Sequence, residues 1–245
     1  MYDSIKLSAI MVAIFLAQIS VEGFTDSFVL VSYDVAERPW TLATSIFLHG
    51  SLTHLLSNLF ALLLFGTILE SIIGRARFLL IYFSAGIVAS LATLLFYEAS
   101  LGASGAIFGI LGALAALRPR MAVWVMGIPM PMLAAAGVWL SIDLLGMFAP
   151  SGTANAAHIA GLLFGAAVSL LFFSAYLREE PAEKREYPLS ESTVKRWEEK
   201  YMRFALKGVN LAICMNSPPA LKLKRFAGTI DKHYHAAPRR IVQRR

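Results

Sequence analysis

A serine and a histidine, each near the start of an apolar run, are the residues in this sequence best suited to chemistry. Ser104 lies between the small residues Ala103 and Gly105, so other groups can approach its hydroxyl, and His158 begins a later run. A serine hydroxyl becomes a nucleophile when a base takes its proton, and histidine is the usual base. The pair predicts attack on a carbonyl, with Ser104 as nucleophile and His158 as general base.

Attack on a carbonyl places negative charge on its oxygen, which hydrogen-bond donors must stabilise. His54 and Asn58 lie four residues apart at the start of another apolar run, hence on one face of a helix. Their side chains and the backbone N–H of Ser104 are the predicted donors. Phe108, one turn after Ser104, is expected to stack on the imidazole. Asp143 is the only buried acid available to orient the histidine, and the sequence favours a Ser–His dyad without it.

The composition is that of a membrane protein. Hydrophobic residues make up 57% of the 245 positions and charged residues 16%, whereas a soluble domain carries about 25% charged residues. A mixed segment, 22–47, is expected to lie in the membrane interface, and residues 123–131 to lead into the fifth helix there. Six apolar runs are expected to cross the bilayer, giving an all-α integral membrane fold: 7–21, 52–73, 78–97, 101–117, 132–148 and 154–176.

Basic residues in short loops set the orientation of the runs. Arg75 and Arg77 follow the second run, Arg118 and Arg120 follow the fourth, and a basic segment follows the sixth. These positions share one side of the membrane, so both termini are predicted to be cytoplasmic. The second, fourth and sixth helices then start at the outer face, which places the serine, the histidines and the asparagine in one layer.

Glycine spacing allows the serine and histidine helices to touch. Gly161 and Gly165 follow His158 on one face of the sixth run, and G-x-x-x-G is a packing signal of membrane helices. The small face expected to meet it on the fourth run is Gly105, Gly109 and Gly112.

Two further polar residues are interpreted as structural. His49 precedes Gly50 where the mixed segment joins the second run, and it is expected to orient that segment by hydrogen bonding. Glu70 is expected at the cytoplasmic end of its helix, near Arg75 or Arg77.

Four stretches together resemble the rhomboid family of intramembrane serine proteases: HGSLTHLLSN (49–58), GTILE (66–70), GASGAIFG (102–109) and AHIAGLLFG (157–165). The resemblance covers residues 1–177 and implies a six-helix bundle that cleaves transmembrane segments near the outer face without cofactor or metal. It implies Ser104 as nucleophile, His158 as base, and His54 and Asn58 in the oxyanion site. The matched stretches also contain the supporting residues His49, Gly102, Gly105, Gly161 and Gly165. Phe108 lacks the hydroxyl of the tyrosine that some members carry there.

Residues 178–245 lie outside that resemblance. They carry a net charge of +8, against −2 for residues 1–177, and are predicted to be a basic cytoplasmic tail that meets the anionic membrane surface and not nucleic acid. An amphipathic helix is expected near 190–208. An uncleaved first helix without a transit peptide favours a multi-pass protein of a prokaryotic cell membrane. The sequence sets neither the physiological substrate nor the oligomeric state.

Two other functions stay open at this point. A non-catalytic rhomboid-like protein that binds transmembrane clients would share the fold and would keep its function after Ser104→Ala. A transporter would show an internal repeat or charged residues along a pathway, and neither is evident in the sequence. The sequence therefore favours an intramembrane serine endopeptidase whose partners are transmembrane protein substrates and the lipid bilayer.

Overall fold

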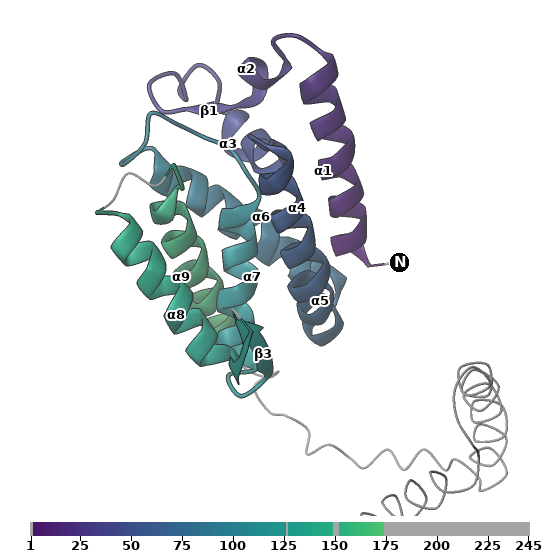
Figure 1. Ribbon diagram of the computed structural model, residues 1–245, viewed down its shortest axis with the longest axis vertical. Coiled ribbons are helices and arrows are strands. Elements are labelled where there is room, and N and C mark those ends of the chain that lie inside the picture. Colours follow the sequence, from purple (N-terminus) through teal and green to yellow (C-terminus); the bar gives the residue numbers. More distant parts are fainter. Residues whose placement is uncertain (1, 126, 149–151, 174–245) are drawn as a thin grey trace, which may run out of the picture. The chain divides into compact units, whose positions relative to one another are not determined.

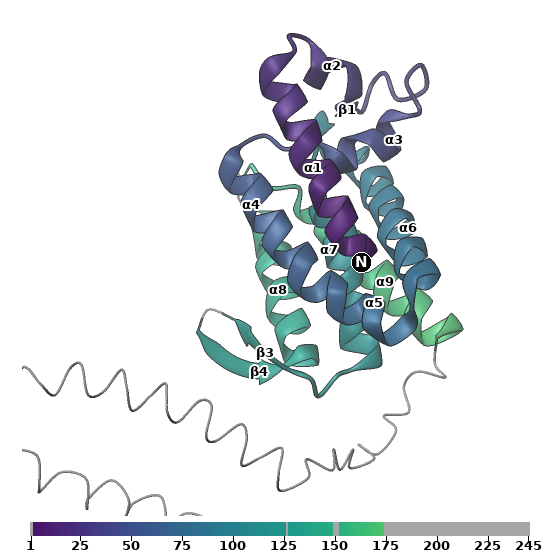
Figure 2. The ribbon, with the colours of Figure 1, turned by 90° about the vertical axis from the view of Figure 1, so that its right-hand side faces the viewer.

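The apolar runs of the chain form helices throughout the residues that the computed structural model describes, which are 2–125, 127–148 and 152–173 (Figures 1 and 2). The tail 178–245, its expected amphipathic helix and the domain boundary after residue 177 lie outside the described residues. A 3₁₀ turn, η1 (Ser45–Phe47), precedes α4, and a π-helical stretch, η2 (Leu62–Gly66), joins α4 to α5. The α-helices are α1 (Asp3–Ser20), α2 (Phe24–Phe28), α3 (Thr41–Thr44), α4 (Leu52–Ala61), α5 (Thr67–Ile73), α6 (Arg75–Thr93), α7 (Ser104–Leu117), α8 (Met132–Gly146) and α9 (Asn155–Phe172).

Four of these helical stretches are long and apolar enough to cross a membrane: α1, the continuous Leu52–Ile73, α6 and α9. α7 and α8 are also apolar, but they have only 14 and 15 residues. The described residues thus supply four of the six expected spans at full length. The fourth expected run is shortened because its helix begins only at Ser104, after Gly102, whose φ of +126° is incompatible with a helix.

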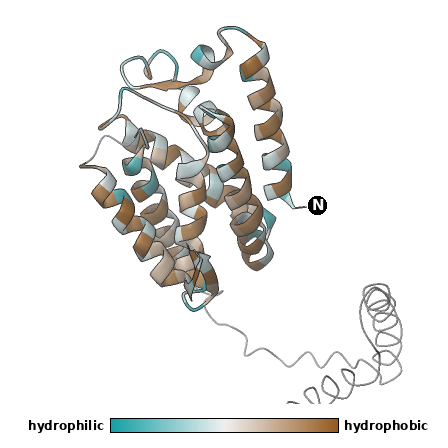
Figure 3. Cartoon of the chain, viewed as in Figure 1, coloured by the Kyte–Doolittle hydropathy of each residue, from teal (hydrophilic) through white to brown (hydrophobic). Residues whose placement is uncertain are grey.

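The outside of the bundle is apolar as well as the core, as the brown outer faces in Figure 3 show. Large apolar side chains are more than half exposed on five of the helices: Leu16, Phe60, Leu80, Leu145 and Phe172. Soluble monomers rarely expose apolar surface so continuously. The surface suits contact with lipid, and the chain is a multi-pass integral membrane protein.

α7 runs through the middle of the bundle (Figure 1). Eleven of its fourteen residues are buried, as expected of a helix that is apolar on every side. Gly105 and Gly109 turn toward α6, because a Cβ atom on them would lie 2.4 Å and 2.2 Å from the Cβ atoms of Ala89 and Ala85. These two glycines therefore pack closely against α6 as well as against the histidine helix, where the sequence placed them.

α7 and α9 touch backbone to backbone through their glycines. A Cβ atom on Gly161 would lie 2.1 Å from the carbonyl oxygen of Gly105, and one on Gly165 would lie 1.9 Å from that of Gly109. Gly112 also faces α9, where its added Cβ atom would meet the carbonyl oxygen of Leu162 at 1.9 Å. The expected close contact between the serine and histidine helices is present, and it leaves no room for a side chain.

Glu70 lies near the end of α5, as expected, and holds the start of α1. Its carboxylate accepts hydrogen bonds from the backbone N–H groups of Asp3 and Ser4, at 2.8 Å and 3.0 Å, and from the Ser4 hydroxyl at 3.1 Å. The first N–H groups of a helix lack partners within it and carry partial positive charge, so a buried carboxylate satisfies both needs. Arg75 forms its ion pair with Asp3.

The segment between α1 and α4 is more regular than a mixed loop. It contains α2, α3 and a short strand, β1 (Leu30–Val31), which pairs antiparallel with β2 (Ala99–Ser100). Because β2 comes shortly before α7, this pairing fastens the segment at the end of the bundle where Ser104 lies. We call this end the site end.

At the opposite end of α7 the chain forms a β-hairpin, where the sequence suggested only an irregular lead-in to α8. β3 (Ala122–Val125) pairs antiparallel with β4 (Ile128–Pro131), and Gly127 in the connection has a φ of +81°. Val123 and Val125 are buried while Trp124 is exposed, which is the alternation of a strand. α8 then begins at Met132, as expected.

Candidate active site

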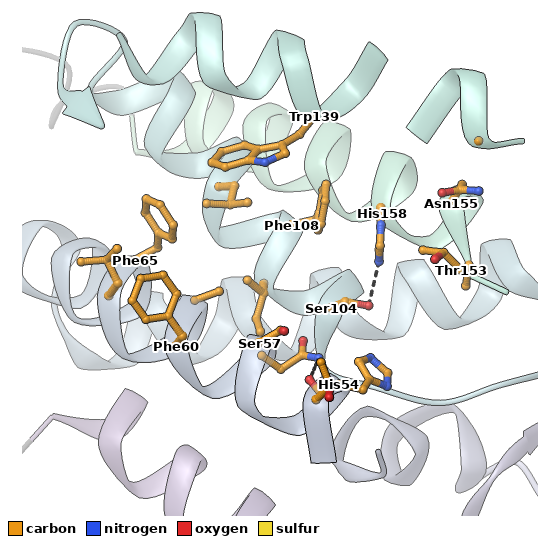
Figure 4. A pocket seen from close by; sticks show the side chains of 18 of the residues that line it. His54, Ser57, Phe60, Phe65, Ser104, Phe108, Trp139, Thr153, Asn155 and His158 are labelled. Atoms are coloured by element: carbon orange, nitrogen blue, oxygen red, sulfur yellow. Dashed lines mark hydrogen bonds between the residues drawn. The ribbon is translucent and has the colours of Figure 1, made fainter. Parts of the chain in front are cut away.

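Ser104 and His158 meet at the site end, where α7 and α9 both begin (Figure 4). Nε2 of His158 lies 2.8 Å from Oγ of Ser104, within hydrogen-bond distance. The two residues are 54 positions apart in the sequence, and the glycine-mediated contact between their helices brings them together. This is the geometry of a serine nucleophile and its base.

Asp143, near the end of α8, contacts the other nitrogen of the same imidazole. Its Oδ1 lies 2.9 Å from Nδ1 of His158, and the residue is only 5% exposed. A carboxylate there accepts the Nδ1–H hydrogen bond and leaves Nε2 free to take the serine proton. The sequence favoured a Ser–His dyad without Asp143, whereas this contact places the acid beside His158. An acid inside an apolar helix is itself a sign of function, and this sign was present in the sequence.

Phe108 stacks on the imidazole, as its spacing predicted. The ring centroids of Phe108 and His158 are 4.1 Å apart and the ring planes differ by 7°. Together with the Asp143 contact, the stacking restricts both the tilt and the rotation of the imidazole. The lost tyrosine hydroxyl therefore does not prevent stacking.

His54 and Asn58 lie on the α4 wall that faces Ser104. The hydroxyl of Ser51 caps α4 by accepting the His54 backbone N–H at 3.1 Å. The His54 imidazole approaches Gly102 so closely that a Cβ atom there would lie 2.7 Å from its Cε1 atom. Asn58 donates from Nδ2 to the carbonyl oxygen of His54 at 2.8 Å, which fixes the orientation of its amide and leaves a second N–H for other acceptors.

His49 lies behind His54 and does not line the cavity described below. Its backbone N–H donates to the Gln18 side chain at 2.9 Å, its Nδ1 lies 3.2 Å from the carbonyl oxygen of Phe47, and its ring meets the His54 ring edge-on at 5.1 Å. These contacts support the structural role expected for it. Burial, helped by the charge of His54, lowers the pKa of His49 to about 4.

This low pKa predicts an acid-sensitive fold. The unfolded chain, with an ordinary imidazole pKa of 6.5, binds a proton before the folded chain does. The contribution of neutral His49 to stability is thus complete above pH 6.5 and is lost as the pH falls toward 4. We expect the thermal unfolding midpoint in detergent to fall over this range, and to fall less in His49→Gln. Parallel pH profiles for the two proteins would contradict this role of His49.

A cavity of about 1310 Å³ joins these groups. Five of the residues proposed from the sequence line this cavity: Ser104, His158, His54, Asn58 and Phe108. The glycines at 102, 105, 161 and 165 do not line it, since they act through close packing. Trp139 and Asn155 also line it and were missed, because an indole or an amide in an apolar helix has no distinguishing spacing. Over the described part of the chain, no group of three or more His, Cys, Asp or Glu side chains could hold a metal ion.

Comparison with known proteins agrees with this arrangement. The chain is similar to the rhomboid protease GluP of Bacillus subtilis, with 38% identity in an alignment of 154 residues that covers 58% of this chain and 29% of that protein. It is similar to the putative rhomboid protease YdcA of the same organism, with 45% identity over 76 residues, or 30% of this chain and 38% of that protein. It is also similar to the mitochondrial rhomboid protein 1 of Saccharomyces cerevisiae, with 30% identity over 157 residues, or 58% of this chain and 44% of that protein.

The aligned part of this chain therefore spans less than half the length of each of these relatives. The family model described as the rhomboid domain matches residues 36–175, which is more than half of this chain and contains Ser104, Asp143 and His158. The chain belongs to the rhomboid family.

Proposed function

We propose that this protein is an intramembrane serine endopeptidase that cleaves the transmembrane segments of other proteins. The observation that carries the proposal is the 2.8 Å contact between Nε2 of His158 and Oγ of Ser104 on the wall of one large cavity. Membership of a family that acts on transmembrane substrates within the bilayer supports it.

In the proposed reaction, His158 takes the proton from Ser104 as Oγ attacks the carbonyl carbon of the substrate. The tetrahedral intermediate collapses when the imidazolium gives this proton to the leaving nitrogen, and an acyl-enzyme on Ser104 remains. Water, activated by the same imidazole, then releases the acid and restores the serine. Asp143 holds the imidazole in the required tautomer through Nδ1.

The oxyanion is proposed to form between α4 and the start of α7. The backbone N–H of Ser104 belongs to the first turn of α7, where N–H groups lack partners within the helix and the helix dipole is positive. His54 and Asn58 line the same cavity. Each well-aimed donor to an oxyanion contributes a factor of about 10²–10³ in rate.

We propose that the short length of α7 places the reacting serine below the membrane surface. Its fourteen residues span about 20 Å, whereas the hydrocarbon core is about 30 Å thick. When the far end of α7 lies at one surface, Ser104 lies roughly 10 Å below the other. Substrate reaches it as a membrane-embedded segment, and its backbone carbonyl must first leave its helical hydrogen bond. Small or helix-breaking residues at the cut would lower this cost.

We propose that six helical segments cross the bilayer, with both termini on the cytoplasmic side. The segments are α1, α4–α5, α6, α7, α8 and α9. The basic residues support this orientation, since Arg75 and Arg77 begin α6 and Arg118 and Arg120 follow α7. The site end then faces the outside. The Bacillus relatives favour a prokaryotic cell membrane, and the yeast relative makes a mitochondrial membrane the alternative.

The proposal is tested with the whole 245-residue chain in lipid vesicles. A fluorophosphonate probe transfers its phosphonyl group to an activated serine oxygen with loss of fluoride, so we expect one adduct per chain, on the peptide that contains Ser104. A reporter with one apolar segment and a Gly-Ala pair near its outer end should be cut once. Absence of both the adduct and the cut would overturn the proposal in favour of client binding.

Asp143 gives a separate prediction. Asp143→Asn should lower kcat roughly 10²–10⁴-fold with little change in KM, and at least as strongly as Asp143→Ala. The reason is that the amide of the introduced asparagine can donate to Nδ1, which stabilises the wrong imidazole tautomer. Steady-state cleavage of the reporter measures both constants. If the Asp143→Asn variant behaved like the wild type, Asp143 would be a packing residue only.

A further inference from the structure

The cavity does not end at the catalytic pair but continues along α7 toward the β3–β4 hairpin. Its α4–α5 wall runs from His54 to Ile68, a distance of about 21 Å at the rise of a helix. Figure 4 shows Phe60, Phe65 and Trp139 on the side of the cavity that lies away from Thr153 and Asn155. Beyond them, Val123 and Trp124 of β3 line its far end.

The lining changes character along this length. Polar side chains gather at the site end: Ser51, His54, Asn58, Ser104, Asn155 and His158. From Ile107 onward the α7 wall is apolar, and none of the described lining residues along the whole cavity is Asp, Glu, Lys or Arg. This gradient fits a peptide that is extended and hydrogen-bonded near Ser104, then helical and apolar farther along.

Two tryptophans line the cavity beyond its polar end, Trp139 in the middle and Trp124 at the far end. Trp139 of α8 meets Phe65 of η2 edge-on, with ring centroids 6.0 Å apart. Trp124 is 73% exposed although its neighbours in β3 are buried. The hairpin that carries it is closed at the start of α8 by a 2.8 Å hydrogen bond from the Met132 N–H to the carbonyl oxygen of Met121. Trp124 is therefore an exposed aromatic side chain on a fixed element.

We propose that Trp124 forms the far subsite of a substrate groove, of which Trp139 lines the middle, and contacts the substrate's apolar segment about 13 residues from the cleaved bond. We assign the groove to the substrate's apolar segment for one reason. The groove and the catalytic pair share one cavity, and the apolar segment is continuous with the bond that is cleaved there. From Ser104 to Leu117, α7 rises about 20 Å, which a helical substrate covers in about 13 residues. The inference rests on the proposed function and adds a length requirement to it.

Disulfide mapping tests the contact. The chain carries Ser104→Ala to keep the substrate uncut, Cys214→Ser to remove its only thiol, and Trp124→Cys. It is placed in vesicles of phosphatidylethanolamine and phosphatidylglycerol with reporters that carry one cysteine, moved from about 5 to about 20 residues past the cut. After oxidation with copper phenanthroline, we expect cross-linking to peak about 11–15 residues past the cut.

Ile128→Cys in the same background is the matched control. Ile128 lies in β4 of the same hairpin and is 60% exposed, yet it does not line the cavity. It should cross-link weakly and without preference for position. A flat profile for Trp124→Cys, or one equal to that of Ile128→Cys, would overturn the inference and leave the far cavity to lipid.

Cleavage gives an independent measure in chains that keep Ser104. Trp124→Ala should lower kcat/KM for the reporter about 10-fold, as loss of an aromatic anchor does, while Trp124→Phe restores most of it and Ile128→Ala changes nothing. Equal rates in Trp124→Ala and wild type would contradict the subsite. If wild type neither reacts with the fluorophosphonate nor cuts the reporter, the proposed function is wrong and so is this inference. If wild type reacts with the fluorophosphonate and also cuts the reporter, the cross-linking profile tests the subsite separately from the proposed function.

Discussion

Ser104→Ala and His158→Ala are each expected to reduce cleavage of a transmembrane reporter to background, a loss of roughly 10⁴–10⁶-fold in kcat. Alanine at 104 removes the nucleophile, and alanine at 158 removes the group that takes its proton. The two effects should not add, because each residue needs the other. The double variant should therefore be no slower than either single variant, which reporter cleavage in vesicles measures directly.

Ser141→Ala controls for loss of a serine from an apolar helix. The Ser141 hydroxyl donates to the carbonyl oxygen of Gly137 at 2.8 Å, within its own helix α8, and lies away from the cavity. Cleavage by this variant should equal that of wild type. Retained cleavage in Ser104→Ala would exclude the catalytic assignment. Full client binding in an inactive wild type would instead favour the non-catalytic reading of the rhomboid fold.

Gly161→Ala is expected to have the second large effect, on both stability and rate. An added Cβ atom would lie 2.1 Å from the carbonyl oxygen of Gly105, so α7 and α9 must separate by about 1 Å to restore ordinary contact. Such overpacking costs about 1–3 kcal/mol. The shift also pulls His158 from Ser104, and we expect cleavage to fall about 10²-fold, as a 1 Å misplacement does.

Gly137→Ala provides the matched comparison. Gly137 also lies inside an apolar helix, α8, but nothing lies within 4 Å of an added Cβ atom there. The unfolding midpoint of the Gly137→Ala variant should equal that of wild type or rise slightly, since alanine is a better helix former than glycine. Thermal unfolding in detergent and reporter cleavage measure both variants. Equal behaviour of Gly161→Ala and Gly137→Ala would refute the backbone contact between α7 and α9.

Much of the helical framework follows from local patterns. The run predicted over 52–73 is one of the stretches able to span a membrane, and the start of α8 at Met132 was predicted too. The match of residues 36–175 to the rhomboid domain confirms the family inferred from four short stretches. These features are readable because a long apolar run, a G-x-x-x-G spacing and a Ser between small residues are each encoded by neighbouring residues.

The β3–β4 hairpin and the β1–β2 pairing could not be predicted from the sequence. β3 and β4 have four residues each, too few for period-2 alternation to stand out, and Pro129 and Pro131 argue against a strand unless it is an edge strand, as β4 is. β1 pairs with β2 across a long stretch of intervening chain, and no local pattern encodes such a partner.

The sequence by itself determined which residues could do the chemistry; only the tertiary structure decided which of them meet. Asp143 reaches His158 because α8 ends beside the start of α9. Gly105 and Gly109 contact α6 as well as α9, because the rotation of α7 about its axis is set by everything packed around it. Residue types are local properties, whereas the distance between side chains on separate helices depends on how the whole bundle packs.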